Sequence, residues 1–200
     1  MGAAPVRHLS AAETARLVRA ALKRAFPAVR FSVRSRSYAG GSSVDVRWTD
    51  GPTTRQVEAV ARQYEGRRFD GSIDLGWTVR LWLMPDGTAT VASDPGSEGS
   101  MGGRPALRRP MPCAGAELVG AGSWVSCDRE RSGPFEAAVV AHLRRRGWPM
   151  GEARCAADLS RVPDPALAGA SPLDLFARTA QRTERRPDGG LTIHKARVGA

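Results

Sequence analysis

The sequence predicts an α+β fold, and three observations in its first seventy residues carry that prediction. An amphipathic helix that starts with a capping box precedes two stretches in which apolar and polar residues alternate, and a second capped helix follows them. An apolar period near 3.6 indicates a helix, whereas a period of two indicates a strand. We therefore expect an N-terminal α-β-β-α unit with a small antiparallel sheet and both helices on the same face.

The first helix is predicted over residues 11–25. Ser10 and Glu13 have the spacing of a capping box, apolar residues then recur at helical spacing, and Pro27 prevents continuation. The two strands that follow meet across a Gly-Gly connection. Their inward-facing apolar residues are Val29, Phe31, Val33, Val44, Val46 and Trp48. The alternation predicts a hairpin with one buried face.

The second helix is expected after the Asp-Gly-Pro turn that ends the second strand. Thr53 and Gln56 form another capping box, and Gly66 is predicted as a left-handed C-cap. A second hairpin is expected from residues 77–84 and 88–92, joined by a Pro-Asp-Gly turn. Residues 1–92 are thus predicted to form one α+β domain with an added hairpin.

The remaining chain has weaker patterns. Residues 93–112 are rich in Gly, Ser and Pro and are predicted to be a linker or mobile loop. Residues 113–200 are predicted to be an irregular, Arg-rich C-terminal region with two helices. The helices are expected at 134–146, where Gly147 would take a left-handed conformation, and at 171–182. A pair of short strands is expected within 119–127, and one short strand within 191–198.

The net charge and the cysteine content limit the possible partners and the cellular compartment of the protein. The formal net charge is +10, which favours a polyanionic partner, although nearly all of it is Arg and GC-rich codons would also produce that bias. Three cysteines and no long apolar run indicate a reduced, soluble, cytoplasmic protein without a membrane partner. The sequence does not indicate an oligomeric state.

The central stretch resembles the large polyvalent protein-associated domains, and among them the one numbered 29. The resemblance covers about residues 10–75. The matching residues are Phe26-Pro27, Phe31-Ser32-Val33-Arg34-Ser35, Tyr38, Gly40-Gly41-Ser42-Ser43, Val44, Val46, Trp48, Asp50-Gly51-Pro52 and Phe69-Asp70-Gly71. The resemblance implies a bacterial setting, in a module of proteins that bacteriophages and conjugative plasmids encode and deliver with their DNA. It implies no catalytic residues.

A basic strand face next to the Gly-Gly-Ser-Ser turn is the candidate binding surface. Glycines let backbone amides approach an anion, and Arg binds phosphate with two donors. The candidate nucleic-acid-binding residues are Arg34, Arg36, Tyr38, Gly40, Gly41, Ser42, Ser43 and Arg47. The alternative interpretation is that the glycines only make the turn and the arginines are the solvated face of a sheet.

A secondary basic patch is Arg144, Arg145 and Arg146, whose charges either follow a phosphate backbone or complement the end of a helix. Cys113, Cys127, His142 and Cys155 lack the spacing of zinc ligands, and the cysteines are interpreted as structural or buried thiols. No metal site is predicted.

The sequence does not indicate an enzyme or a cofactor. It lacks a phosphate-binding loop, a nucleophile elbow and a dinucleotide fingerprint. Asp50, Asp70 and Asp74 are the carboxylates a catalytic site would use, but Asp-Gly pairs more simply form turns. We predict a non-enzymatic accessory protein of a mobile genetic element that binds nucleic acid. The alternative is a protein-protein interaction module that acts on a host protein. A counter-defence role, in which the module blocks a host defence protein, is one form of this alternative.

Overall fold

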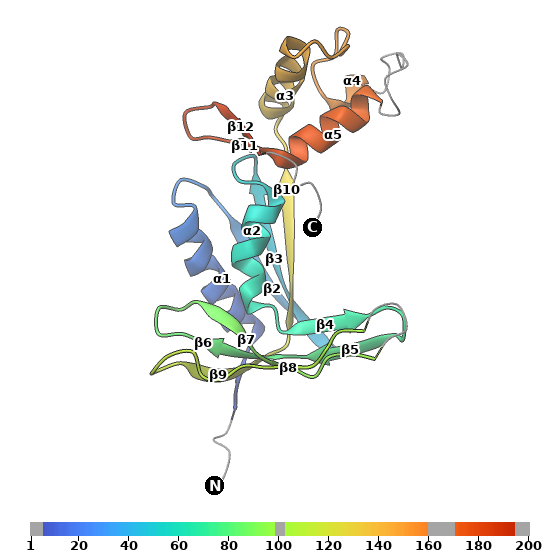
Figure 1. Ribbon diagram of the computed structural model, residues 1–200. Coiled ribbons are helices and arrows are strands. Elements are labelled where there is room, and N and C mark those ends of the chain that lie inside the picture. Colours follow the sequence, from blue (N-terminus) through green and yellow to red (C-terminus); the bar gives the residue numbers. More distant parts are fainter. Residues whose placement is uncertain (1–5, 99–102, 160–170, 195–200) are drawn as a thin grey trace. The chain divides into compact units, whose positions relative to one another are not determined.

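The computed structural model describes residues 6–98, 103–159 and 171–194 and confirms the α+β class. Its contacts divide the chain into two compact units, whose elements Figure 1 labels. Unit 1 comprises residues 1–27, 31–47 and 57–128, and unit 2 comprises residues 28–30, 48–56 and 129–200.

Unit 1 contains most of a three-stranded sheet with β3 in its centre. The strands are β2 (Ser32–Tyr38), β3 (Gly41–Thr49) and β10 (Ser123–Glu130). β2 and β3 pair antiparallel, which confirms the predicted hairpin, but β2 begins at Ser32, so the placement of Val29 and Phe31 in this strand is wrong. Ser42 contacts Ser123, and Asp45 contacts Ser126, so residue numbers rise in the same direction along β3 and β10. β10 therefore runs parallel to β3 and forms an edge of the sheet.

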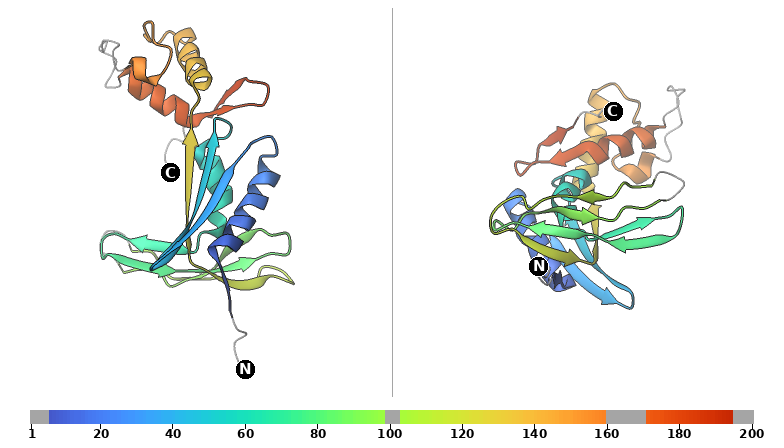
Figure 2. Two further views of the ribbon diagram at one scale, coloured as in Figure 1. Left: turned by 180° about the vertical axis from the view of Figure 1, so that it is seen from behind. Right: turned by 60° about the horizontal axis from the view of Figure 1, so that its bottom comes forward.

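Two helices cover one face of this sheet, as expected (Figures 1 and 2). They are α1 (Ala11–Ala25) and α2 (Thr54–Ala61), which continues into the 3₁₀ helix η1 (Arg62–Tyr64). The predicted capping box begins α1, because Glu13 N–H donates to Ser10 Oγ at 3.2 Å and Ser10 N–H donates to the Glu13 carboxylate at 2.9 Å. Val18 and Leu22 of α1 and Val46 of β3 are fully buried, so the apolar stripe and the inner strand face form the core.

Unit 1 also contains a five-stranded sheet in the order β1-β9-β6-β7-β8. Its strands are β1 (Arg7–Leu9), β9 (Glu117–Ala121), β6 (Arg80–Leu83), β7 (Ala89–Asp94) and β8 (Leu107–Arg108). The pairing of β6 with β7 confirms the second hairpin. The single strand predicted over 77–84 is instead two strands, because Trp77 lies in β5 (Leu75–Thr78), which pairs with β4 (Arg67–Asp70).

The two strands expected within 119–127 exist but do not pair with each other. β9 pairs with β1 and β6, whereas β10 pairs with β3. Strands on both sides of the predicted 93–112 linker therefore belong to unit 1, and the contacts divide the chain elsewhere. The partners of β9 and β10 are far away in the sequence, so local hydrophobic periodicity does not reveal which strands pair.

The predicted left-handed C-cap at Gly66 is wrong, because this residue is not among the glycines with a positive φ. A Cβ at Gly66 would collide with the backbone carbonyl of Ala121. Gly66 N–H donates to Ser123 O at 3.2 Å, and Val79 N–H donates to Gly66 O at 2.8 Å. The glycine is needed for the close approach of two backbones and not for a turn.

Unit 2 has a core of its own. Its elements are α3 (Gly133–Arg145), α4 (Ala156–Leu159), α5 (Pro172–Arg182), β11 (Thr183–Arg185) and β12 (Leu191–Ile193). Both predicted C-terminal helices are confirmed, and α4 and the β11–β12 hairpin add to them. The core residues are Phe135, Val139, Val140, Leu143, Met150, Ala153, Leu159, Phe176 and Ala180. Gly147 ends α3 with a φ of +81°, as predicted. Residues 195–198 of the predicted last strand lie outside the described residues.

Candidate functional site

The candidate surface is the face of the β2–β3 hairpin opposite to the helices. The register places Arg34 opposite Asp45, Arg36 opposite Ser43 and Arg47 opposite Ser32. Directly opposite residues of an antiparallel pair point to the same side of the sheet, and alternate residues of one strand do so too. Arg34, Arg36 and Arg47 therefore share one side, which we call the basic face. Among the described residues of unit 1, no helix or strand lies over it (Figure 2, left).

The charges of the basic face are only partly paired. Arg36 Nε lies 3.4 Å from Asp45 Oδ2, and the Arg36 side chain is 67% exposed. Ser126 Oγ also donates to Asp45 Oδ1 at 2.9 Å, so this carboxylate already has two partners. Arg34 and Arg47 are exposed, and within the described part of the chain neither forms an ion pair. The face keeps unpaired positive charge.

The turn between the strands gathers an aromatic ring and a further arginine. Gly40 has a φ of +85°, which favours glycine. Arg67 Nη1 donates to Gly40 O at 2.7 Å. A Cβ at Gly41 would lie 3.1 Å from both Arg67 Nη1 and the ring of Tyr38, whose residue is 52% exposed. Gly41 thus leaves room for both side chains. Sequence reasoning missed Arg67, because only the tertiary contact brings β4 to this turn.

The two serines of the turn lie on different faces. Ser43 is opposite Arg36 and belongs to the basic face. Ser42 points to the other face, where its hydroxyl lies 2.8 Å from Ser123 Oγ. The structure thus brings Arg34, Arg36, Tyr38, Gly40, Gly41, Ser43 and Arg47 together and separates Ser42 from them.

The secondary basic patch lies at the end of α3 in unit 2. Arg144 Nη2 donates to Gly151 O at 2.7 Å and to Ala153 O at 3.0 Å, so this guanidinium holds the following loop. Arg145 and Arg146 are exposed. Burial, with smaller contributions from the charges of Arg145 and Arg146, lowers the pKa of His142. Two of the three arginines thus remain available to a ligand.

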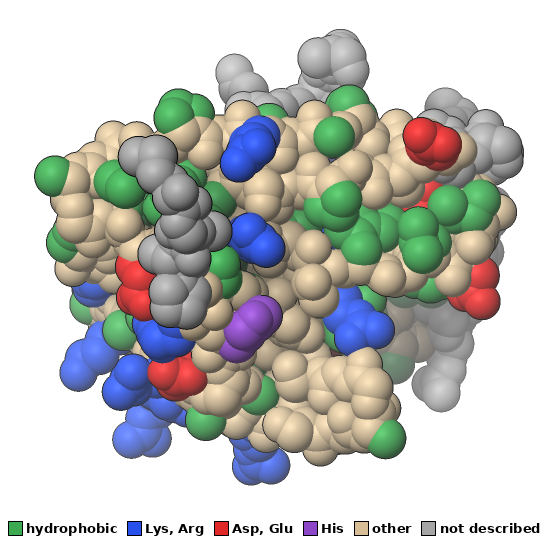
Figure 3. Space-filling model, turned by 90° about the horizontal axis from the view of Figure 1, so that it is seen from below, with side chains coloured by type: hydrophobic (Ala, Val, Ile, Leu, Met, Phe, Trp, Pro, Cys, Tyr) green, Lys and Arg blue, Asp and Glu red, His purple; other side chains and the backbone are tan. Residues whose placement is uncertain are grey.

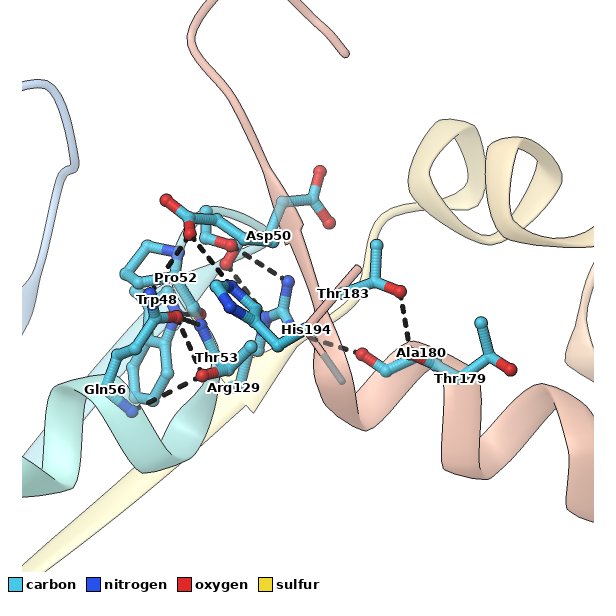
Figure 4. Close-up of polar contacts among 12 residues, drawn as sticks. Trp48, Asp50, Pro52, Thr53, Gln56, Arg129, Thr179, Ala180, Thr183 and His194 are labelled. Atoms are coloured by element: carbon cyan, nitrogen blue, oxygen red, sulfur yellow. Dashed lines mark hydrogen bonds and ion pairs between the residues drawn. The ribbon is translucent and has the colours of Figure 1, made fainter. Parts of the chain in front are cut away.

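A polar network in unit 2 surrounds Asp50, one of the carboxylates considered for catalysis (Figure 4). Asp50 is buried, and its carboxylate accepts hydrogen bonds from Ser132 N–H at 2.8 Å, Ser132 Oγ at 2.7 Å and Arg185 Nη1 at 3.0 Å. Ser132 is the N-cap of α3. Asp50 therefore fixes the start of that helix.

Arg129 completes this network through main-chain contacts. It donates to Asp50 O at 2.9 Å, Gly51 O at 3.0 Å and Ala180 O at 3.3 Å, and its Cζ lies 4.8 Å from the centre of the Phe135 ring. Burial lowers the pKa of Arg129 to about 10. The carboxylate of Asp50 and the guanidinium of Arg129 both bind protein atoms, so they hold the turn after β3 and the start of α3 in place.

Cys127 is a partly buried cysteine of β10. Burial, with a smaller contribution from Glu58, raises the pKa of its thiol to about 12, which is the opposite of an activated nucleophile. Cys113 is exposed, so its interpretation as a buried thiol is wrong, and Cys155 of unit 2 is only partly buried. Within the described ranges, no three His, Cys, Asp or Glu side chains form a group that would hold a metal ion.

The surface of unit 1 also has two grooves, both lined by described residues. One, of about 680 Å³, runs beside the edge strand β10, and we call it the β10 groove. The other, of about 870 Å³, is lined by the exposed Ile73 and Leu75 and by nearby prolines. Seen from below, hydrophobic side chains gather over part of unit 1 (Figure 3).

Comparison with known proteins identifies one family. Residues 9–97 match the model of large polyvalent protein associated domain 29. Neither a curated protein nor a solved structure matches the chain. In the described part of the chain, no helix is both long and apolar enough to cross a membrane. The match includes α1, the β2–β3 hairpin with its basic face, α2 and the strands from β4 to β7. Residues 9–97 of this chain are therefore similar to large polyvalent protein associated domain 29.

Proposed function

We propose that this chain is a non-enzymatic accessory protein of a mobile genetic element and that its basic face binds the backbone of nucleic acid. The observation that carries the binding proposal is the placement of Arg34 and Arg47 on an uncovered sheet face without a carboxylate partner among the described residues. Arginine in that state supplies two parallel donors to a phosphate. The family match of residues 9–97 supports the mobile-element setting.

The neighbouring groups fit the same ligand. Asp45, the acidic residue in this part of the hairpin, is occupied by Arg36 and Ser126 and so repels a phosphate less than a free carboxylate would. Tyr38 presents a half-exposed ring beside Arg67 at the turn. An exposed ring next to cations is the arrangement on which unpaired bases stack.

The test is fluorescence anisotropy with duplex DNA, single-stranded DNA and duplex RNA over a series of salt concentrations. We expect Arg34→Ala/Arg47→Ala to weaken binding and to flatten the slope of log affinity against log salt by up to about 1.8 on duplex DNA, since each phosphate neutralised contributes about 0.9. Arg16→Ala/Lys23→Ala is the matched control, because it removes two exposed charges from α1 on the covered side of the sheet.

The outcomes separate the possible sites. A slope that changes only in the hairpin variant places the phosphates on the basic face. An unchanged slope rejects that face, and Arg145→Ala/Arg146→Ala then tests the end of α3. Absence of salt-dependent binding in the wild type contradicts the proposal, and the basicity would then be compositional.

A further inference from the structure

The edge of β10 leaves main-chain groups open toward the β10 groove. β10 is the terminal strand of its sheet, with β3 on one side. On the other side, Val125 N–H donates to Glu65 Oε1 at 3.1 Å, and Ser123 O accepts from Gly66 N–H at 3.2 Å. Backbone groups of alternate residues point to the same side of a strand. Cys127, two residues on, therefore directs its N–H and C=O toward the groove.

Glu65 and Gly66 cover only the beginning of this edge. No hydrogen bond from another described residue reaches the carbonyl of Val125 or either main-chain group of Cys127, and both residues line the groove. An exposed edge of this kind is a template for one more strand. The carboxylate of Glu65 already takes the place that a carbonyl of such a strand would occupy.

The charges along the β10 groove determine which side chains of an incoming strand would bind favourably. Arg62 is paired with Glu58 at 2.6 Å, and Arg68 is paired with Glu65 at 3.6 Å. Two further arginines of the lining, Arg67 and Arg104, have no carboxylate partner among the described residues. Acidic side chains on an incoming strand would pair with these two guanidinium groups.

The same lining argues against nucleic acid in this place. Asp128 lines the groove, forms no ion pair among the described residues and would repel a phosphate next to it. A nucleic acid also lacks the alternating N–H and C=O groups that extend a sheet. Phe69 lines the groove with its residue 53% exposed, and so offers an apolar contact to a side chain of a polypeptide.

We propose that the β10 groove binds an extended, acidic segment of a partner protein, which pairs with the edge at Val125 and Cys127 as an additional strand. This site shares Arg67 with the turn next to the basic face, but strand pairing at Val125 and Cys127 does not depend on nucleic-acid binding. The main chain supplies the pairing, and Arg67 and Arg104 supply the preference for acidic side chains.

Two pairs of variants isolate these contributions. Cys127→Pro removes the N–H that faces the groove, and proline is tolerated at an edge where the N–H points away from the neighbouring strand, whereas Cys127→Ala keeps the N–H. Arg67→Glu/Arg104→Glu reverses the free charges of the lining, and Arg16→Glu/Lys23→Glu makes the same change on α1. Circular dichroism melts establish that each variant is folded.

The experiment selects random displayed octapeptides for binding to the immobilised full chain. The affinity of the selected peptides is then measured, together with hydrogen exchange of the protein amides. We expect enrichment of acidic, proline-poor peptides. Affinity should fall about tenfold or more in Cys127→Pro and in Arg67→Glu/Arg104→Glu, while Cys127→Ala and the α1 variant keep it, and bound peptide should slow exchange of the Cys127 amide.

Three results would overturn the proposal: no enrichment, equal affinity for the Cys127→Pro and Cys127→Ala variants, or protection of the Cys127 amide by an oligonucleotide and not by peptide. The basic-face test uses Arg34 and Arg47, so failure of one proposal leaves the other standing.

Discussion

At the scale of single residues, Asp50 combines a backbone role with a side-chain role. Its φ of +54° lies in the left-handed region, which Asp and Asn tolerate better than most residues. Its carboxylate accepts both donors of Ser132 and one of Arg185. The Asp-Gly turn predicted from the sequence is therefore also the anchor for the first turn of α3.

Replacement of Asp50 should destabilise unit 2. Asp50→Ala removes the acceptor of the partly buried donors of Ser132 and introduces a residue that disfavours a positive φ, so we expect a loss of about 3 kcal/mol in the free energy of unfolding. Asp50→Asn keeps an oxygen acceptor and tolerance of the left-handed region, and should lose roughly half as much. Urea unfolding followed by tryptophan fluorescence measures both. Equal stability of Asp50→Ala and the wild type would show that the network contributes little.

At the scale of elements, Gly66 determines how the end of η1 joins the sheets. Its backbone lies against Ala121 and bonds to Ser123 and Val79, which belong to three different segments. This close approach brings β4 beside β10, and Arg67 and the wall of the β10 groove follow from it. A side chain at this position would separate the segments.

Gly66→Ala is expected to destabilise unit 1 by more than about 3 kcal/mol, because its Cβ would meet backbone atoms of Ala121 that cannot move aside as a flexible side chain would. Gly122→Ala is the control. A Cβ there meets nothing within 4 Å, so its effect should stay within about 1 kcal/mol. Thermal unfolding by circular dichroism compares them, and similar melting temperatures would contradict the role assigned to Gly66.

The elements that sequence could predict are those defined by local chemistry. The capping boxes, the alternation in β2 and β3 and the left-handed Gly147 each depend on residues close in the chain, and the alternation also predicts that Arg34, Arg36 and Arg47 share a face. The partners of β9 and β10 lie far away in the chain, so no local period reveals them. Arg67 and the β10 groove depend on those pairings and could not be predicted.

At the scale of the whole molecule, unit 2 includes two short segments, residues 28–30 and 48–56, from the first part of the chain. β3 begins in unit 1, but residues 48–56, which include its end and the start of α2, are grouped with unit 2. Within unit 2, Arg129 donates to the carbonyls of Asp50 and Gly51, and Gln56 Nε2 donates to Glu184 Oε2 at 3.0 Å. The second capping box is also here, with Thr53 N–H donating to Gln56 Oε1 at 2.7 Å. Residues 48–56 thus contribute to a unit formed mostly by the end of the chain.

A fragment of residues 129–200 is therefore expected not to fold alone. It would retain the apolar core around Phe135 and Phe176, but Arg129 would lose two carbonyl acceptors, and Ser132 would lose the carboxylate that fixes the start of α3. A small core has little stability in reserve, so these losses decide the outcome. We expect a narrow range of amide shifts in the ¹H–¹⁵N spectrum of the fragment and a dispersed one when residues 48–56 are joined to it by a flexible Gly-Ser linker. A dispersed spectrum of the fragment alone would show that its apolar core is sufficient for folding. If instead the spectrum is dispersed only when residues 48–56 are attached, and Asp50→Ala removes that dispersion, the turn after β3 is needed to complete unit 2.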